Sequence, residues 1–222
     1  MKKFVIFAML LLLAAIGCGG GKGEVVKAEL PILEVGNKWV YKWVAEDIDY
    51  TCTIEVTGED TVDGKDCYIT QWSFEPALEG VANSATVHIE KATYREAKGQ
   101  MTGQVQGLPY SLVTTSSYTF PEGSGWPLEV GKEISATETT TTTITARGQT
   151  ETETETETYT YKVEKVEEIT VAAGTFKCLK VVRYDDEGKK SETSWHSDKV
   201  RNDVKWIDHE SGDYTELRSY SL

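Results

Sequence analysis

The sequence predicts an all-β protein, an antiparallel, strongly curved sheet or open barrel built from two similar β units. Three observations lead to this prediction. The chain is rich in Thr, Val, Tyr and Trp, which favour strands. Residues 50–56 and 159–163 alternate so that every second side chain faces the same way, as in a half-buried strand. Gly, Asp and Asn residues, which favour turns, separate such segments.

Turn-forming stretches at residues 185–189 and 208–213 lie between strand-like segments and predict two hairpin turns. Only residues 75–85 and 89–98 favour short helical pieces. We therefore expect hairpins throughout, with little helix.

An internal repeat divides the chain. Leu-Glu-Val-Gly occurs at residues 33–36 and again at 128–131, each time shortly after a proline. Downstream, residues 62–67 resemble residues 171–178, and both end in a cysteine. We interpret this as a duplication of about 31–120 and 121–222, whose units pack side by side because each alone would expose an apolar face. Chance similarity in a Thr-rich β protein is the alternative.

The first 17 residues have the pattern of a targeting segment. Lys2 and Lys3 precede an apolar run over residues 4–16, which is shorter than the roughly 20 residues needed to span a bilayer. The run ends in Ala15-Ile16-Gly17-Cys18, which resembles the lipobox of bacterial lipoproteins, although Ala15 stands where Leu is more common. The resemblance implies cleavage before Cys18 and lipid attachment to its thiol. An ordinary secretory signal is the alternative.

The domain organisation follows from this boundary. Residues 1–17 are the predicted lipoprotein signal peptide, residues 18–30 the lipidated cysteine with a glycine-rich tether, and residues 31–222 a single all-β domain. We expect an extracytoplasmic protein anchored to a bacterial membrane through lipid on Cys18. That membrane is the outer one if the cell has one, since Gly19 differs from the aspartate that retains lipoproteins at the inner membrane.

Composition excludes some partners. The 222 residues carry 36 acidic and 23 basic side chains, a net charge of −13, so we expect no binding to nucleic acid. Besides Cys18 there are three cysteines, Cys52, Cys67 and Cys178, which allow at most one intramolecular disulfide. Whether Cys67 pairs with Cys52 or with Cys178 stays open. Their spacing does not fit a zinc site.

No catalytic residues are predicted. Trp195-His196-Ser197-Asp198 contains the residue types of a hydrolase triad, but adjacent strand residues point to opposite faces, so His196 cannot reach both neighbours. Gly123-Ser124-Gly125 lacks the nucleophile-elbow pattern. We therefore expect the protein not to be an enzyme.

No metal site or cofactor is predicted either. His88 and His209 have no histidine partner at ligand spacing. Two acidic stretches, at residues 60–66 and 208–213, resemble calcium loops but lack the spacing that brings oxygens round one ion. Ordinary turn chemistry explains both stretches.

The segment 137–159 is the most unusual. Pairing two strands about Arg147-Gly148 makes one face entirely threonine and puts Glu151, Glu153, Glu155 and Glu157 on the other. The simpler interpretation is a protruding hairpin too charged to aggregate. The alternatives are weak divalent-cation binding or an extended contact surface.

Aromatic residues offer a second candidate surface. Trp39, Tyr41 and Trp43 alternate and share one strand face. That face lines either a packed core or a concavity that holds an apolar or sugar ligand.

Three motifs carry a wider resemblance: the Pro-x-Leu-Glu-Val-Gly opening followed by Trp39, the segment 171–181, and the closing elements around Trp195 and Trp206. Together they resemble a group of uncharacterised bacterial secreted β proteins, some of which are compared with half-barrel carriers of lipoproteins. The resemblance implies a curved sheet or open barrel and no catalytic residues. We expect a lipid-anchored binding or carrier protein of unknown ligand, or alternatively a structural or interaction protein of the envelope without a pocket.

Overall fold

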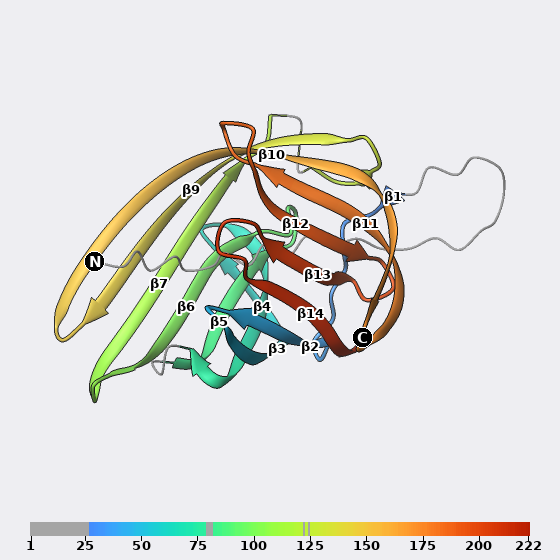
Figure 1. Ribbon diagram of the computed structural model, residues 1–222. Coiled ribbons are helices and arrows are strands. Elements are labelled where there is room, and N and C mark those ends of the chain that lie inside the picture. The colour runs from blue at the N-terminus through green and yellow to red at the C-terminus, as the bar shows by residue number, and fades with distance from the viewer. Residues whose placement is uncertain (1–26, 79–81, 122, 124) are drawn as a thin grey trace, which may run out of the picture.

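The computed structural model describes residues 27–78, 82–121, 123 and 125–222 (Figure 1). Within them the chain forms strands joined by turns and irregular segments, and no helix there could cross a membrane. The strands are β1 (Lys27–Ala28), β2 (Lys38–Ala45), β3 (Ile48–Val62), β4 (Lys65–Leu78), β5 (Ala82–Glu90), β6 (Glu96–Val105), β7 (Leu108–Thr119), β8 (Leu128–Glu129), β9 (Glu133–Ala146), β10 (Gln149–Val171), β11 (Gly174–Tyr184), β12 (Lys190–Ser197), β13 (Asn202–Asp208) and β14 (Tyr214–Ser221).

Twelve of the described strands form one antiparallel barrel in which each strand pairs with the next along the chain. Strand β8 is passed over, since β7 pairs directly with β9, and β8 forms a separate small ribbon with β1. The all-β antiparallel prediction is confirmed, but the barrel is closed and not open. Pairing of β14 with β2 joins the two ends of the sheet, so neither β2 nor β14 is left as an edge strand.

The two predicted helical pieces are wrong. Of the first piece, residues 75–78 belong to β4 and residues 82–85 to β5, and of the second, residues 89–90 belong to β5 and residues 96–98 to β6. Ile89 pairs across the ladder with Glu96, and Ile89 is buried in the core. Cross-strand pairing and burial therefore override a weak local preference for helix.

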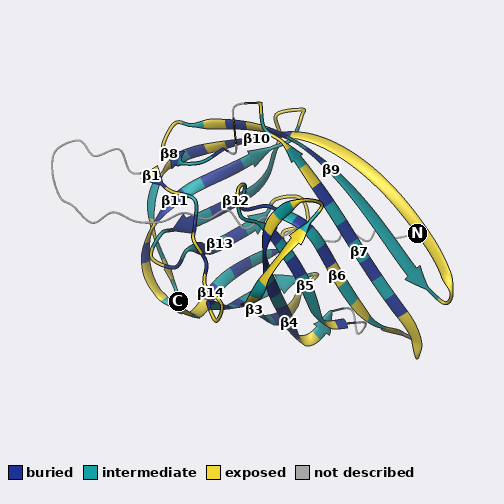
Figure 2. Cartoon of the chain, turned by 180° about the vertical axis from the view of Figure 1, so that it is seen from behind, coloured by how far each residue is buried: buried dark blue, intermediate teal, exposed yellow. Residues whose placement is uncertain are grey.

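The barrel interior is packed with aromatic and aliphatic side chains. Trp39 and Tyr41 are buried, and Trp43 packs partly buried against the same cluster, which confirms that the three share one face. Cys52 is buried in this cluster too. Figure 2 shows buried and less buried residues alternating along the strands of the barrel body, as expected when one face of each strand is turned inward.

Local geometry agrees with several sequence features. The predicted hairpin turns join β11 to β12 and β13 to β14. The two Leu-Glu-Val-Gly turns make matching backbone contacts: Gly36 N–H donates to Val56 at 2.8 Å, and Gly131 N–H donates to Val163 at 2.8 Å. The duplication itself stays a prediction.

The β9–β10 hairpin has the predicted register about Arg147-Gly148, with Thr143 opposite Thr152 and Glu138 opposite Glu157. We call residues 139–158 the Thr/Glu hairpin. Its β9 strand is covered by β7, but β11 pairs with β10 only from Thr160 onward. Residues 149–158 therefore form a free sheet edge that sweeps away from the barrel body (Figure 1) and is exposed along its whole length (Figure 2).

Candidate functional site

Polar side chains gather on the inner wall of the barrel, next to the Thr/Glu hairpin. Tyr159 and Tyr161 alternate with buried Val163, so they face inward, and Glu138 has the inward parity of Ile134 and Ala136 on β9. Hydrogen bonds and ring contacts link them to side chains of β7, β11, β12 and β13 and to Arg95 in the segment before β6. The hydrogen-bonded pair of Thr114 and Glu96 is included because the charge of Glu138 acts on Glu96. We call this set the inner polar cluster: Arg95, Glu96, Thr114, Tyr118, Glu138, Tyr159, Tyr161, Arg183, Glu192 and Trp206.

Glu138 lies at the centre of the cluster and is only 6% exposed. The Tyr118 hydroxyl donates to Oε1 at 2.5 Å, and the Tyr159 hydroxyl donates to Oε2 at 3.0 Å. Thr140 donates to Oε1 at 3.1 Å. Three hydroxyl donors thus compensate the cost of burying this carboxylate.

Arg183 connects the cluster to the root of the Thr/Glu hairpin. Its Nη1 donates to Glu192 Oε1 at 2.5 Å, and its Nη2 donates to Glu157 Oε2 at 3.0 Å. The guanidinium lies 4.1 Å from the centroid of the Tyr159 ring. Trp206 Nε1 donates to the second oxygen of Glu192 at 3.1 Å. Ion pairs, a cation–π contact and a hydrogen bond from an indole N–H therefore converge around the Arg183 guanidinium and its Glu192 partner.

Arg95 is the most enclosed cation of the cluster, with 5% of its surface exposed. Nη1 donates to the Tyr161 hydroxyl at 3.1 Å, and the guanidinium carbon lies 4.5 Å from the centroid of that ring. The rings of Tyr118 and Phe120 lie 5.9 Å away. Among the described residues no carboxylate comes within 4 Å of it, so aromatic faces replace an ion pair.

Glu96 occupies a niche made by a missing side chain. Thr114 donates to its Oε1 at 2.6 Å, and Gly99 N–H donates to Thr114 Oγ1 at 3.1 Å. A Cβ on Gly99 would lie 2.5 Å from Thr114 Oγ1 and 2.7 Å from Glu96 Oε1, so only glycine fits. Burial raises the pKa of Glu96 to about 7, and the charge of Glu138 adds to the rise.

His196 lies elsewhere in the barrel, paired with Asp203 on the next strand. Its Nδ1 is 3.2 Å from Asp203 Oδ1, and Nε2 is 3.9 Å from Asp198 Oδ1. Burial raises the pKa of Asp203 to about 6, although His196 opposes the rise. Ser197, which follows His196 in sequence, is also buried. The absence of enzymatic activity stays a prediction.

Other candidates from the sequence are dispersed. His88 Nε2 is 3.5 Å from Asp60, and His209 Nε2 is 2.8 Å from Thr193 Oγ1. In the described part of the chain, no three His, Cys, Asp or Glu residues are grouped so that they could hold a metal ion. Cys18 and Ser124 lie outside the described residues.

The three described cysteines are free and buried thiols. Burial raises the pKa of Cys178 to about 12 and that of Cys52 further. The structure therefore contains neither of the two Cys67 pairings that the sequence left open.

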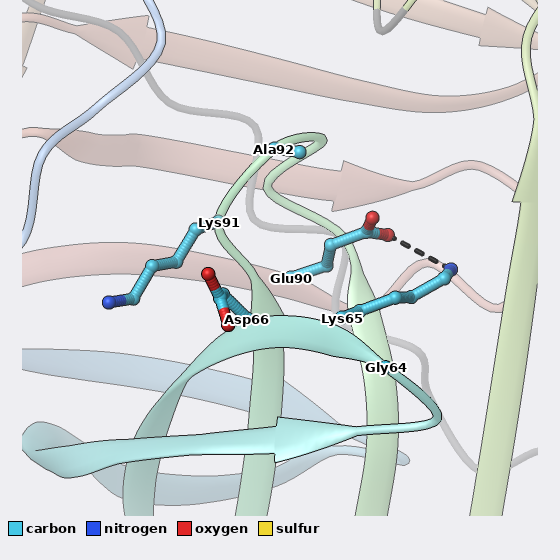
Figure 3. Close-up of a pocket in the computed structure, with 6 residues that line it drawn as sticks. All are labelled: Gly64, Lys65, Asp66, Glu90, Lys91 and Ala92. Carbon is cyan, nitrogen blue, oxygen red and sulfur yellow. Dashed lines mark hydrogen bonds and ion pairs between the residues drawn. The ribbon is translucent and has the colours of Figure 1, made fainter.

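A shallow pocket of about 460 Å³ lies outside the inner polar cluster (Figure 3). It is formed by the β3–β4 turn and the segment after β5, and Lys65 Nζ donates to Glu90 at 3.1 Å within it. Its second lysine, Lys91, is paired with Glu59 at 2.7 Å. Half of its lining residues, Gly64, Asp66 and Ala92, are exposed, so the pocket does not enclose a ligand and we do not consider it the site.

No local pattern in the sequence points directly to the inner polar cluster, because its members come from strands far apart along the chain. One signal was available. Glu138 is separated by an even number of residues from apolar Ile134 and Ala136, so its carboxylate is expected on the same inward face of the strand. Its partners could not be identified without the barrel's closure, which brings β7, β9 and β10 together.

Comparison with known proteins gives distant structural likenesses. A Bacteroides fragilis protein, provisionally named an exported protein with a YmcC-like fold, is 9% identical, with a TM-score of 0.42 over 85% of this chain and 97% of that one. A Parabacteroides distasonis protein, provisionally named a lipoprotein, is 15% identical, with a TM-score of 0.39 over 85% and 96%. No curated protein matches the sequence.

A match at the level of sequence families covers more than half of the chain. The profile of the DUF3108-like family matches residues 83–209, from β5 to the turn after β13. The matched stretch contains every member of the inner polar cluster. The chain belongs to the DUF3108-like family.

Proposed function

We propose that the chain is an extracytoplasmic, lipid-anchored binding protein whose ligand contacts the inner polar cluster. The location is supported by the N-terminal pattern of Lys2, Lys3, an apolar run and Cys18. Acyl chains on Cys18 and the tether that follows would keep the barrel close to a membrane surface.

The observation that carries the ligand proposal is the concentration of buried polar groups around Glu138. Burying carboxylates and guanidinium groups costs free energy, and a purely structural barrel has no need of them at this density. Groups of this kind converge at binding sites, where they orient a ligand. Aromatic rings beside paired carboxylates and guanidinium groups suit a ligand with both hydroxyl groups and an apolar face, such as a sugar.

Native mass spectrometry tests the ligand proposal. We would purify the mature chain carrying Cys18→Ser gently from an envelope fraction, and compare it with the same chain carrying Glu138→Gln. The matched control is Glu55→Gln, which removes a carboxylate from an exposed ion pair with Lys38. We expect a bound mass of small-molecule size in the parent chain and in the control, and its loss in Glu138→Gln.

Two results would contradict the proposal. A parent chain that stays free of bound mass after incubation with envelope extract argues against a ligand. A bound mass that survives Glu138→Gln and Arg183→Gln places the ligand away from the cluster. Near-ultraviolet circular dichroism of each variant shows whether the fold is intact, so loss of ligand is separated from loss of structure.

The anchor has its own test. Cells expressing the full chain would be labelled with radioactive palmitate, with Cys18→Ser as the comparison. Label in the parent chain that disappears in Cys18→Ser supports lipidation. Equal label in both, or none in either, counts against it.

A second candidate, an interaction protein of the envelope that needs no internal ligand, is favoured by the contrast between the two parts of the molecule. Large side chains such as Trp39, Tyr41 and Tyr94 pack into the barrel body. The Thr/Glu hairpin instead presents a long exposed strand to any neighbour.

A further inference from the structure

The free edge of β10 is a ready-made pairing surface. Residues 149–158 pair with β9 on one side and with no described strand on the other. The two-residue turn makes Gln149 and Ala146 a hydrogen-bonded pair, so the odd-numbered residues bond to β9. The amide and carbonyl groups of the threonines at even positions, from Thr150 to Thr158, therefore point outward along the free edge.

The inner face of the same edge carries uncompensated negative charge. Across the ladder, Glu151 faces Ile144, Glu153 faces Thr142 and Glu155 faces Thr140. No basic side chain of the described residues lies within ion-pair distance of these three carboxylates. Among the four glutamates of residues 149–158, only Glu157, at the root of the hairpin, forms an ion pair, with Arg183.

We propose that this edge binds an extended protein segment with Lys or Arg at alternate positions, which joins the sheet as an added strand beside β10. Backbone hydrogen bonds to the threonine positions provide the pairing. Basic side chains on the inner face lie opposite Glu151, Glu153 and Glu155 and provide the selectivity. The inference rests on the second candidate function and is independent of the inner polar cluster.

Charge selects this occupant over a second copy of the chain. Two β10 edges pairing antiparallel would align the two glutamate rows across the ladder, and like charges directly opposite destabilise a sheet. A partner rich in acidic residues meets the same repulsion, which the net charge of −13 strengthens.

The test uses the full chain and a synthetic peptide of about ten residues in which Thr and Lys alternate. A peptide of the same composition, with its lysines in one block, is the ligand control. The variant Glu151→Lys/Glu153→Lys/Glu155→Lys reverses the row. The control variant Asp186→Lys/Glu187→Lys/Glu210→Lys reverses the same number of charges in the exposed β11–β12 and β13–β14 turns.

Titration calorimetry should show that the alternating peptide binds the parent chain and the control variant with similar affinity. Binding to the Glu151→Lys/Glu153→Lys/Glu155→Lys variant should be at least about tenfold weaker, and binding to the parent chain should weaken as the salt concentration rises. Hydrogen exchange should show new protection of the amides at residues 150, 152, 154, 156 and 158. These slowed amides distinguish strand addition from loose charge attraction.

Equal affinity for both peptides, or binding without protection of those amides, overturns the proposal in favour of non-specific attraction. No binding to the parent chain overturns it outright, as does concentration-dependent self-association of the parent chain through the same amides. Peptide binding to Glu138→Gln at parental strength is expected, so failure of the ligand site and failure of the edge are told apart.

Discussion

The barrel body and the Thr/Glu hairpin are built from the same secondary structure yet differ in what stabilises them. In the body, one face of each strand is buried in a shared aromatic core. In the hairpin, residues 147–158 are exposed on both faces, and threonine hydroxyls pair across the two strands, Thr141 with Thr154 at 3.0 Å and Thr143 with Thr152 at 3.2 Å. Packing therefore supports the body, whereas strand propensity and backbone pairing support the hairpin.

The largest effect that would sharpen this contrast is expected from Trp39→Ala. Trp39 is 1% exposed, and its Nε1 donates to the Val200 carbonyl at 2.7 Å. Removing it leaves a cavity and an unpaired carbonyl, so we expect a loss of about 3–5 kcal/mol in the free energy of unfolding, measured by urea denaturation. A loss below about 1 kcal/mol would mean that the interior is not close-packed.

A pH dependence of stability should arise in the barrel body. Glu96 and Asp203 have folded pKa values of about 7 and about 6, above the ordinary 4.5 and 3.8. The folded protein therefore holds protons that the unfolded chain releases. The stability that these two groups contribute is greatest below about pH 4 and is lost as pH rises to about 7, by at most about 1.4 kcal/mol per pH unit for each group.

Urea unfolding at about pH 5 and about pH 8 measures this fall, above the range where paired carboxylates such as Glu164, with its lowered pKa, lose their contribution. Glu96→Gln removes one titrating group and should make the fall smaller. Equal falls in the parent chain and in Glu96→Gln would show that Glu96 is ionised in the folded protein at neutral pH.

Gly99→Ala should have an intermediate effect, since the added methyl group must displace both Thr114 and Glu96. We expect a loss of about 1–3 kcal/mol, measured in the same unfolding assay. Thr114→Ala removes the closer of the two oxygens, so the double variant should lose less than the sum of the single variants. Strict additivity would mean that the niche relaxes in some other way.

The smallest effect is expected in the hairpin. Thr141→Ala removes one exposed hydroxyl pair, with Thr154, from a half-buried residue. We expect a change within about 0.5 kcal/mol in the free energy of unfolding. A loss comparable to that of Trp39→Ala would erase the distinction between the two regions.

Sequence reasoning reached the fold class and the register of the hairpin because both depend on local pattern. Side chains that alternate in polarity identify strands, and the Arg147-Gly148 turn sets which threonines pair across the hairpin. The closure of the barrel and the inner polar cluster depend on contacts between distant residues, such as Arg95 with Tyr161. No local pattern encodes those contacts, so the cluster could not be foreseen beyond the inward parity of Glu138.

Barrel closure also has a consequence for how the chain acquires its structure. The ladder between β2 and β14 joins Trp39 to Tyr220 and Val44 to Tyr214. No fragment that lacks β14 can complete the ring, and a chain emerging from its N-terminus carries β2 as an unpaired edge until β14 has been made. Pairing between strands so far apart in sequence forms slowly. The newly made protein is therefore most prone to aggregate before β14 pairs with β2.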